Sequence, residues 1–212
     1  MKYYQEIMLL PGEEVPADFL WQKLYRQLHY GLVTLKAAGI APLAVSFPDY
    51  DLDRKRCRLG LRMRLFSLDK SSLETFAAEG QFRALMDYVC IRPIEAVPPA
   101  VSYAAYIRRQ GIGAKRSEEK NKRNRVLFEG KSRSGEISKA KKEFMEIPYS
   151  PLGLPFIWLN SDSTKKASIG SSCKFPLFIE KRKVESSGPG DAHGLSCYGL
   201  SSTACPIAVP EF

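Results

Sequence analysis

The sequence predicts an α+β protein in which a β-α-β-β-α-β unit, residues 1–98, precedes a smaller part, residues 99–212, that combines a basic helix with strands. Two observations support this fold class. Strand and helix patterns follow one another in that order over the first 98 residues. After Pro98-Pro99 the chain changes character, because most of its surplus positive charge lies beyond this point.

The first strand is predicted at residues 2–10, KYYQEIMLL, and is followed by a long amphipathic helix. Asp18 is expected to cap the start of this helix, which should end near Ala38-Gly39. Two neighbouring rows recur every four residues along it: Leu20, Leu24, Leu28 and Leu32, and beside them Trp21, Tyr25, His29 and Val33. A second, short strand is expected at residues 41–47, APLAVSF.

Residues 57–66, CRLGLRMRLF, alternate charged and apolar side chains, which predicts a half-exposed strand with its arginines facing solvent. A second helix is expected at about residues 70–87 and a fourth strand at residues 88–97. The order is that of the split βαβ, or ferredoxin-like, unit. This fold carries many unrelated functions, so it does not identify one.

The second part begins with a basic segment, residues 105–146, which holds 13 Lys and Arg against six Glu. A helix is predicted there at about residues 117–128. Further strands are expected at residues 154–161, 174–184 and 195–202. We therefore expect a carboxy-terminal domain that contains a helix rich in lysine and arginine.

Composition narrows the functional classes. A net charge of +9 over 212 residues favours a polyanionic partner. The five cysteines never occur as CxxC, which argues against a disulfide framework or a zinc site and is consistent with the reducing cytoplasm. No apolar run is long enough to cross a membrane. Gly130-Lys131-Ser132 lacks the earlier glycine of a phosphate loop, so no nucleotide cofactor is expected. With only two histidines, far apart in the sequence, a metal site would need a cluster of carboxylates, and none stands out, so no metal is expected.

The basic segment has two readings. A run of charge is usually a solvated helix face, and charge alone does not decide between that reading and a nucleic-acid surface. Arg108 and Gln110 favour nucleic acid, because arginine can bond the edge of guanine through two hydrogen bonds and glutamine that of adenine. Two residues apart on a strand, they would point the same way.

His29 is one of only two histidines in the chain. A lone histidine on a helix is more often structural than catalytic, and no nucleophile motif accompanies this one. If it does take part in chemistry, the role that suits it is that of a general base.

Several segments together resemble the type I-F CRISPR-associated repeat endoribonucleases. They are KYYQEIMLLP, LHYGLV and AVSFPDYD in the first part, and LPFIWLNSDST, FPLFIEK and CYGLSS in the second. The likeness covers most of the chain and is weakest over about residues 115–150.

The resemblance implies a metal-independent nuclease that cuts a CRISPR transcript at the base of each repeat hairpin. His29 would lie beside the attacking 2′-hydroxyl, Ser161 would help to fix that ribose, and Tyr198 would lie near the active site. Ser163 belongs to the same segment as Ser161, and Phe175 would pack against an RNA base. Arg108 and Gln110 would read the bottom of the stem. Phosphate contacts would come from basic residues: Arg109, Lys115, Arg116, Lys120, Arg123 and Arg125.

The implied partners are the repeat hairpin RNA and the backbone and large subunits of the type I-F surveillance complex. Some such complexes serve Tn7-like transposition rather than defence, and the sequence leaves that choice open. It also leaves open a second function, that of a non-catalytic subunit that binds the guide hairpin. Charge supports both functions equally, and only His29 with Ser161 separates them.

Overall fold

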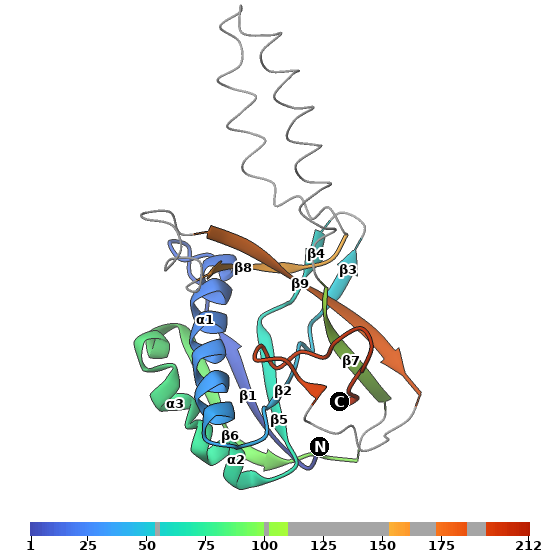
Figure 1. Ribbon diagram of the computed structural model, residues 1–212. Coiled ribbons are helices and arrows are strands. Elements are labelled where there is room, and N and C mark those ends of the chain that lie inside the picture. The colour runs from blue at the N-terminus through green and yellow to red at the C-terminus, as the bar shows by residue number, and fades with distance from the viewer. Residues whose placement is uncertain (54–55, 100–101, 110–152, 162–172, 186–193) are drawn as a thin grey trace, which may run out of the picture.

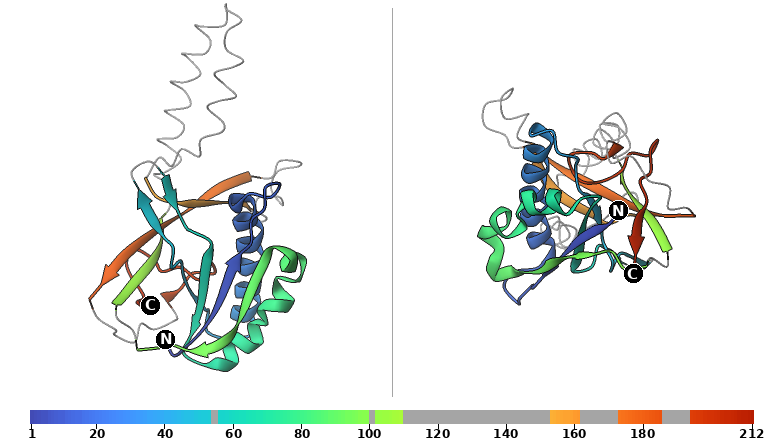
Figure 2. Two further views of the ribbon diagram at one scale, coloured as in Figure 1. Left: turned by 180° about the vertical axis from the view of Figure 1, so that it is seen from behind. Right: turned by 90° about the horizontal axis from the view of Figure 1, so that it is seen from below.

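The computed structural model describes residues 1–53, 56–99, 102–109, 153–161, 173–185 and 194–212. Within these ranges the chain forms two four-stranded antiparallel sheets, a small β-hairpin and a set of helices (Figure 1). The helices gather on one side of the molecule, and the β7 and β10 end of the second sheet lies on the other (Figure 2). The mixed α+β class predicted from the sequence is confirmed.

The first sheet has the strand order β2-β5-β1-β6. Its strands are β1 (Tyr3–Leu9), β2 (Ala44–Ser46), β5 (Arg62–Ser67) and β6 (Val89–Ala96). Every neighbouring pair is antiparallel, with β1 in the middle between β5 and β6. This order and these directions are the ones that a split βαβ unit requires.

Helix α1 (Ala17–Ala37) crosses from β1 to β2 and buries its leucine row together with Trp21 and Tyr25. Pro16 occupies the N-cap position, so the prediction that Asp18 caps the helix is wrong. Asp18 lies in the first turn instead, where its negative charge interacts favourably with the positive end of the helix dipole. The end near Ala38-Gly39 is confirmed, and Gly39 there adopts a left-handed φ of 75°.

The second helical connection is broken where one helix over 70–87 was expected. It consists of α2 (Lys70–Phe76), α3 (Ala78–Gln81) and the 3₁₀ helix η1 (Arg83–Tyr88). Ala77 stands between α2 and α3 with a φ of 48°, outside the right-handed helical region. This residue turns the chain so that the rings of Phe76 and Phe82 pack edge to face in the core. Their centroids are 5.9 Å apart.

The predicted strand over 57–66 is divided in two. Its first residues belong to a hairpin of β3 (Asp51–Asp53) and β4 (Arg56–Arg58), and β5 begins after Gly60, whose φ is 81°. The expectation that the arginines face solvent fails at Arg64, which is only 7% exposed. Its guanidinium donates to Glu6 over 2.8 Å and to the Phe212 carbonyl over 2.7 Å, so its charge and hydrogen bonds are satisfied inside the protein.

The second sheet has the order β10-β7-β9-β8. Its strands are β7 (Ser102–Arg109), β8 (Phe156–Ser161), β9 (Cys173–Val184) and β10 (Val209–Glu211). Strands β8 and β9 confirm two of the predicted strands. The prediction of a strand at 195–202 is wrong, because that segment is a turn. It is closed by an isolated bridge between Leu195 and Ser201 and joined to β7 by another between Ser201 and Ile107.

Buried side chains from both sheets form one continuous core. It runs from Ile7 and Leu24 in the first part to Ile157, Ile179 and Val209 in the second. A domain boundary at 98/99 therefore stays a prediction. The basic helix expected at about 117–128 lies outside the described residues.

Candidate functional site

His29 lies on α1 and is half-buried against the turn at 196–201. Its Nδ1 lies 2.9 Å from the backbone carbonyl oxygen of Cys197. A carbonyl oxygen can only accept a hydrogen bond, so Nδ1 carries the proton and donates it. In the neutral ring the lone pair is therefore on Nε2, and this atom is the one that can take up a proton.

Tyr198 fixes the plane of the histidine ring. The two rings are stacked, with centroids 4.5 Å apart and an angle of 13° between their planes. Burial raises the pKa of the Tyr198 hydroxyl above its usual value near 10, although the nearby Arg108 charge acts in the opposite direction. The hydroxyl therefore stays protonated at neutral pH, so Tyr198 can donate a hydrogen bond there but cannot act as the base.

The turn that carries Cys197 and Tyr198 is bonded to three elements. The Tyr25 hydroxyl of α1 donates to the Tyr198 carbonyl over 2.9 Å, and the Val45 amide of β2 donates to the Gly199 carbonyl over 2.9 Å. At β7, the Arg108 amide donates to the Ser201 carbonyl over 2.9 Å. The turn thus fixes the acceptor of His29 relative to α1 and both sheets.

Gly199 is required at the centre of this turn. Its φ of 70° is in the left-handed region, and a Cβ at this position would lie 2.4 Å from Val45 Cγ2 and 2.9 Å from the Leu43 carbonyl oxygen. The second contact is with backbone, which cannot move aside cheaply. The motif CYGLS therefore has a structural reason for its glycine.

Replacing Gly199 with alanine is expected to lower the free energy of unfolding by about 2–4 kcal/mol, since left-handed strain and overpacking add together. Chemical denaturation measures this change. Gly39→Ala is the matched control, because Gly39 has a φ of 75° but nothing within 4 Å of the added Cβ. The control should cost only the backbone strain, about 1–2 kcal/mol. Equal losses in the two variants would contradict the packing argument.

Arg108, near the end of β7, places its guanidinium 4.7 Å from the centroid of the Tyr198 ring. Within the described part of the chain its buried Nε has no hydrogen-bond acceptor. An unsatisfied buried donor of this kind costs about 1–3 kcal/mol, which a ligand acceptor would recover. The structure therefore brings His29 and Arg108, two of the predicted site residues, to the same tyrosine ring, that of Tyr198.

Three other predicted site residues lie within the described ranges. Arg109 is ion-paired with Glu180 of β9 over 3.2 Å, and Phe175 is half-buried against the core. Ser161 is the last residue of β8, a strand that lies against α1. The remaining predicted residues lie outside the described ranges: Gln110, Lys115, Arg116, Lys120, Arg123, Arg125 and Ser163.

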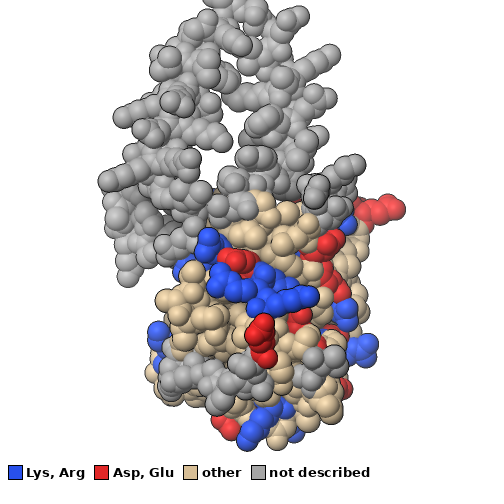
Figure 3. Space-filling view, turned by 90° about the vertical axis from the view of Figure 1, so that its right-hand side faces the viewer, with Lys and Arg blue, Asp and Glu red and all other residues tan. Residues whose placement is uncertain are grey.

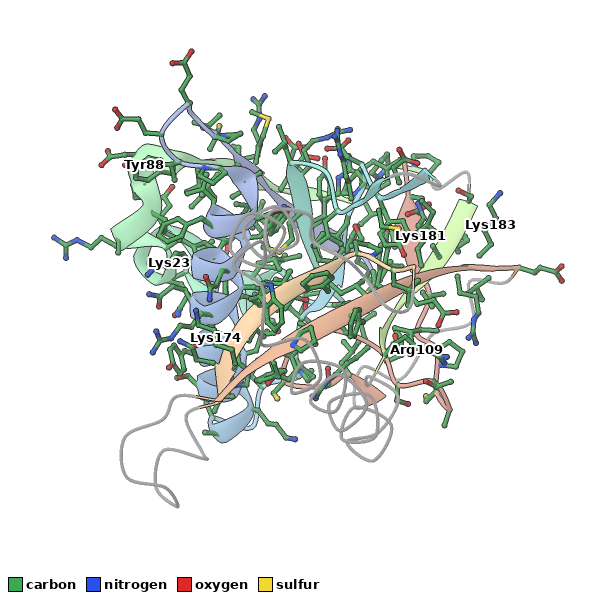
Figure 4. The ribbon with its side chains drawn as sticks, turned by 90° about the horizontal axis from the view of Figure 1, so that it is seen from above. Lys23, Tyr88, Arg109, Lys174, Lys181 and Lys183 are labelled. Atoms are coloured by element: carbon green, nitrogen blue, oxygen red, sulfur yellow. The ribbon has the colours of Figure 1, made fainter. Side chains whose placement is uncertain are left out.

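Sequence reasoning missed two groups. The Cys197 carbonyl and the Tyr25 hydroxyl position the site, but only the fold reveals them. The second group is the set of cations on β9, for which the run KRK at 181–183 was a visible signal. Figure 3 shows lysines and arginines gathered on the side where β9 ends, and Figure 4 shows Lys174 at one end of β9 and Lys181 and Lys183 towards the other. Lys181 is ion-paired with Glu211 over 2.7 Å.

Within the described ranges, no three His, Cys, Asp or Glu side chains come together as a metal-binding group. In the same ranges, no helix is long and apolar enough to span a membrane.

A comparison with known families identifies the family of the chain. The family profile described as "CRISPR-associated protein (Cas_Csy4)" matches residues 4–212, nearly the whole chain. No curated protein matches the chain. The resemblance inferred from the motifs is thus confirmed at the level of the family. The chain belongs to the Cas_Csy4 family of CRISPR-associated proteins, the endoribonucleases that process type I-F CRISPR repeat RNA.

Proposed function

We propose that this protein cuts CRISPR precursor RNA at the base of the repeat hairpin, without a metal ion, by using the RNA's own 2′-hydroxyl as nucleophile. The observation that carries the proposal is the His29 hydrogen bond. Because Nδ1 donates to the Cys197 carbonyl, the ring is held as the tautomer whose Nε2 can accept a proton. Family membership supports the substrate class.

The reaction is a transesterification. Nε2 of His29 takes the proton of the 2′-hydroxyl, O2′ forms a bond to the adjacent phosphorus, and the bond from phosphorus to O5′ breaks. The leaving O5′ takes up a proton from water and His29 releases its proton to solvent, so the products are a 2′,3′-cyclic phosphate and a 5′-hydroxyl. Such a reaction needs a base, alignment of the reacting atoms and cations for the phosphate charge.

Other residues are proposed to meet the remaining two requirements. Ser161, at the end of the strand beside α1, is proposed to hold the attacking ribose, and Tyr198 holds the imidazole plane. Arg108 and Gln110 are proposed to read the bottom of the stem, and Phe175 to pack against an RNA base. The phosphate contacts are assigned to Arg109 and to the basic residues of the segment that follows β7: Lys115, Arg116, Lys120, Arg123 and Arg125. Ser163 is proposed to contribute to RNA binding as well.

After cutting, the protein is proposed to keep the hairpin of the mature guide RNA and to join the other subunits of the type I-F complex in the cytoplasm. The net charge of +9 supports retention, because many phosphate contacts slow dissociation at physiological salt.

The proposal is tested by incubating purified protein with a synthetic repeat RNA in EDTA. We expect complete cleavage in EDTA at the rate seen with Mg²⁺, because no step uses a metal. The upstream product should resist phosphatase until its cyclic phosphate has been opened by acid. If the RNA is bound but stays intact under both conditions, the non-catalytic function is correct. Cleavage that requires Mg²⁺ would refute the metal-independent mechanism.

A further inference from the structure

Tyr198 is a shared neighbour of two residues with different tasks. Its ring stacks on His29, with centroids 4.5 Å apart, and the Arg108 guanidinium lies 4.7 Å from the centroid of the same ring. His29 comes from α1 and Arg108 from β7, so the contact joins the first part of the chain to the second sheet. No other described side chain is in ring contact with both.

Arg108 is held differently from three other arginines in the described part of the chain. Arg62, Arg64 and Arg109 are ion-paired with Asp49, Glu6 and Glu180, which fix their guanidinium planes. Arg108 has no such carboxylate partner in the described part of the chain, and its buried Nε has no acceptor there. The tyrosine ring therefore restricts the plane of the Arg108 guanidinium on one side. A ligand that accepts hydrogen bonds from this guanidinium would restrict it on the other side.

We propose that Arg108 is a positioning residue for His29, acting through Tyr198, so that recognition of a base pair is coupled to the rate of proton removal. The inference rests on the proposed function. A cognate base that accepts two hydrogen bonds fixes the guanidinium plane, the plane holds the tyrosine ring, and the ring holds the imidazole. A wrong base leaves that plane free, and small misplacements of a reacting group slow a reaction strongly.

The proposal predicts a different cleavage rate for an Arg108 variant than for a variant of a residue that only binds RNA. Removing a residue that only contacts a nucleobase weakens the affinity for RNA, and saturating protein restores the full cleavage rate. Removing a residue that also positions His29 slows cleavage even at saturating protein. For Arg108→Ala we therefore expect weaker binding together with a single-turnover rate at saturating protein at least tenfold below wild type.

The coupling can be measured in the protein without RNA, because the chain has only two histidines. Imidazole signals in a ¹⁵N-labelled protein are assigned with His193→Gln, leaving those of His29. Tyr198→Leu should shift them by removing the stacked ring, and Arg108→Ala should shift them in the same direction without touching the histidine. Unchanged His29 signals in Arg108→Ala overturn the proposal.

Matched variants keep the test decisive. Arg182→Ala removes an arginine of the same sheet that pairs with Glu180, and by the register its side chain lies on the opposite face from Arg108, so the His29 signals should not move. Tyr198→Phe keeps the stacked ring and should keep the His29 signals, which covers the case that Tyr198→Leu fails to fold. Arg108→Lys keeps the charge but not the plane, and should be slowed like Arg108→Ala.

A double-mutant cycle completes the argument. If Arg108 acts through Tyr198, the variant carrying both Arg108→Ala and Tyr198→Leu cleaves at saturation no more slowly than the slower single variant. Losses that multiply overturn the coupling. If the wild-type protein does not cleave at all, the proposed function fails, whereas the His29 signals still decide whether Arg108 positions the ring.

Discussion

Replacing His29 with alanine is expected to abolish cleavage while the protein still binds the repeat hairpin. The change removes the only described group that the geometry prepares to accept the proton of the 2′-hydroxyl. General-base catalysis contributes roughly 10²–10⁴-fold, so the single-turnover rate should fall by at least that factor. Affinity should change little, because the phosphate and base contacts are assigned to other residues.

His29→Gln makes the same test with less disturbance. A glutamine amide can still donate to the Cys197 carbonyl, but it cannot take up a proton at neutral pH. The turn should therefore keep its structure while cleavage is lost. His193→Ala is the control and should cleave like wild type. If His29→Gln cuts at the wild-type rate, another residue is the base.

The second large effect concerns the substrate. A single 2′-deoxy substitution in the nucleotide upstream of the scissile phosphate should block cleavage completely, since the attacking oxygen is absent. Binding should persist, because one hydroxyl among many contacts is lost.

The control for this experiment is the same substitution one nucleotide further upstream, which should be cut normally. Both substrates are compared in EDTA by gel analysis of the products. If the first substrate is cut, water is the nucleophile and the transesterification mechanism is wrong.

Much of the fold followed from local patterns, and the failures have physical causes. The leucine row placed α1 correctly, because apolar spacing alone decides which helix face is buried. The break at Ala77 could not be foreseen, since alanine favours helices and only packing forces it into a left-handed conformation. Arg64 was misplaced because one of its acceptors, the Phe212 carbonyl, is far away in sequence.

The sequence predicted which side chains belong to the candidate site, but not how they are arranged. His29, Arg108 and Tyr198 were each identified from motifs, and the structure brings them together around one ring. The segment at 195–202 was expected as a strand because its apolar residues suit one. Its actual shape depends on the left-handed Gly199 and on the amides that bond the turn, neither of which apolar patterning reveals.

The acceptor that selects the His29 tautomer is a backbone atom, and this affects how the site can evolve. Many histidine bases are oriented by an acidic side chain, so a single codon change can destroy them. Here the acceptor is the carbonyl of residue 197, which every amino acid supplies. The side chain at this position is therefore free to drift as long as the turn survives. Selection on the orientation of the proposed base falls instead on Gly199 and on the chain path around it.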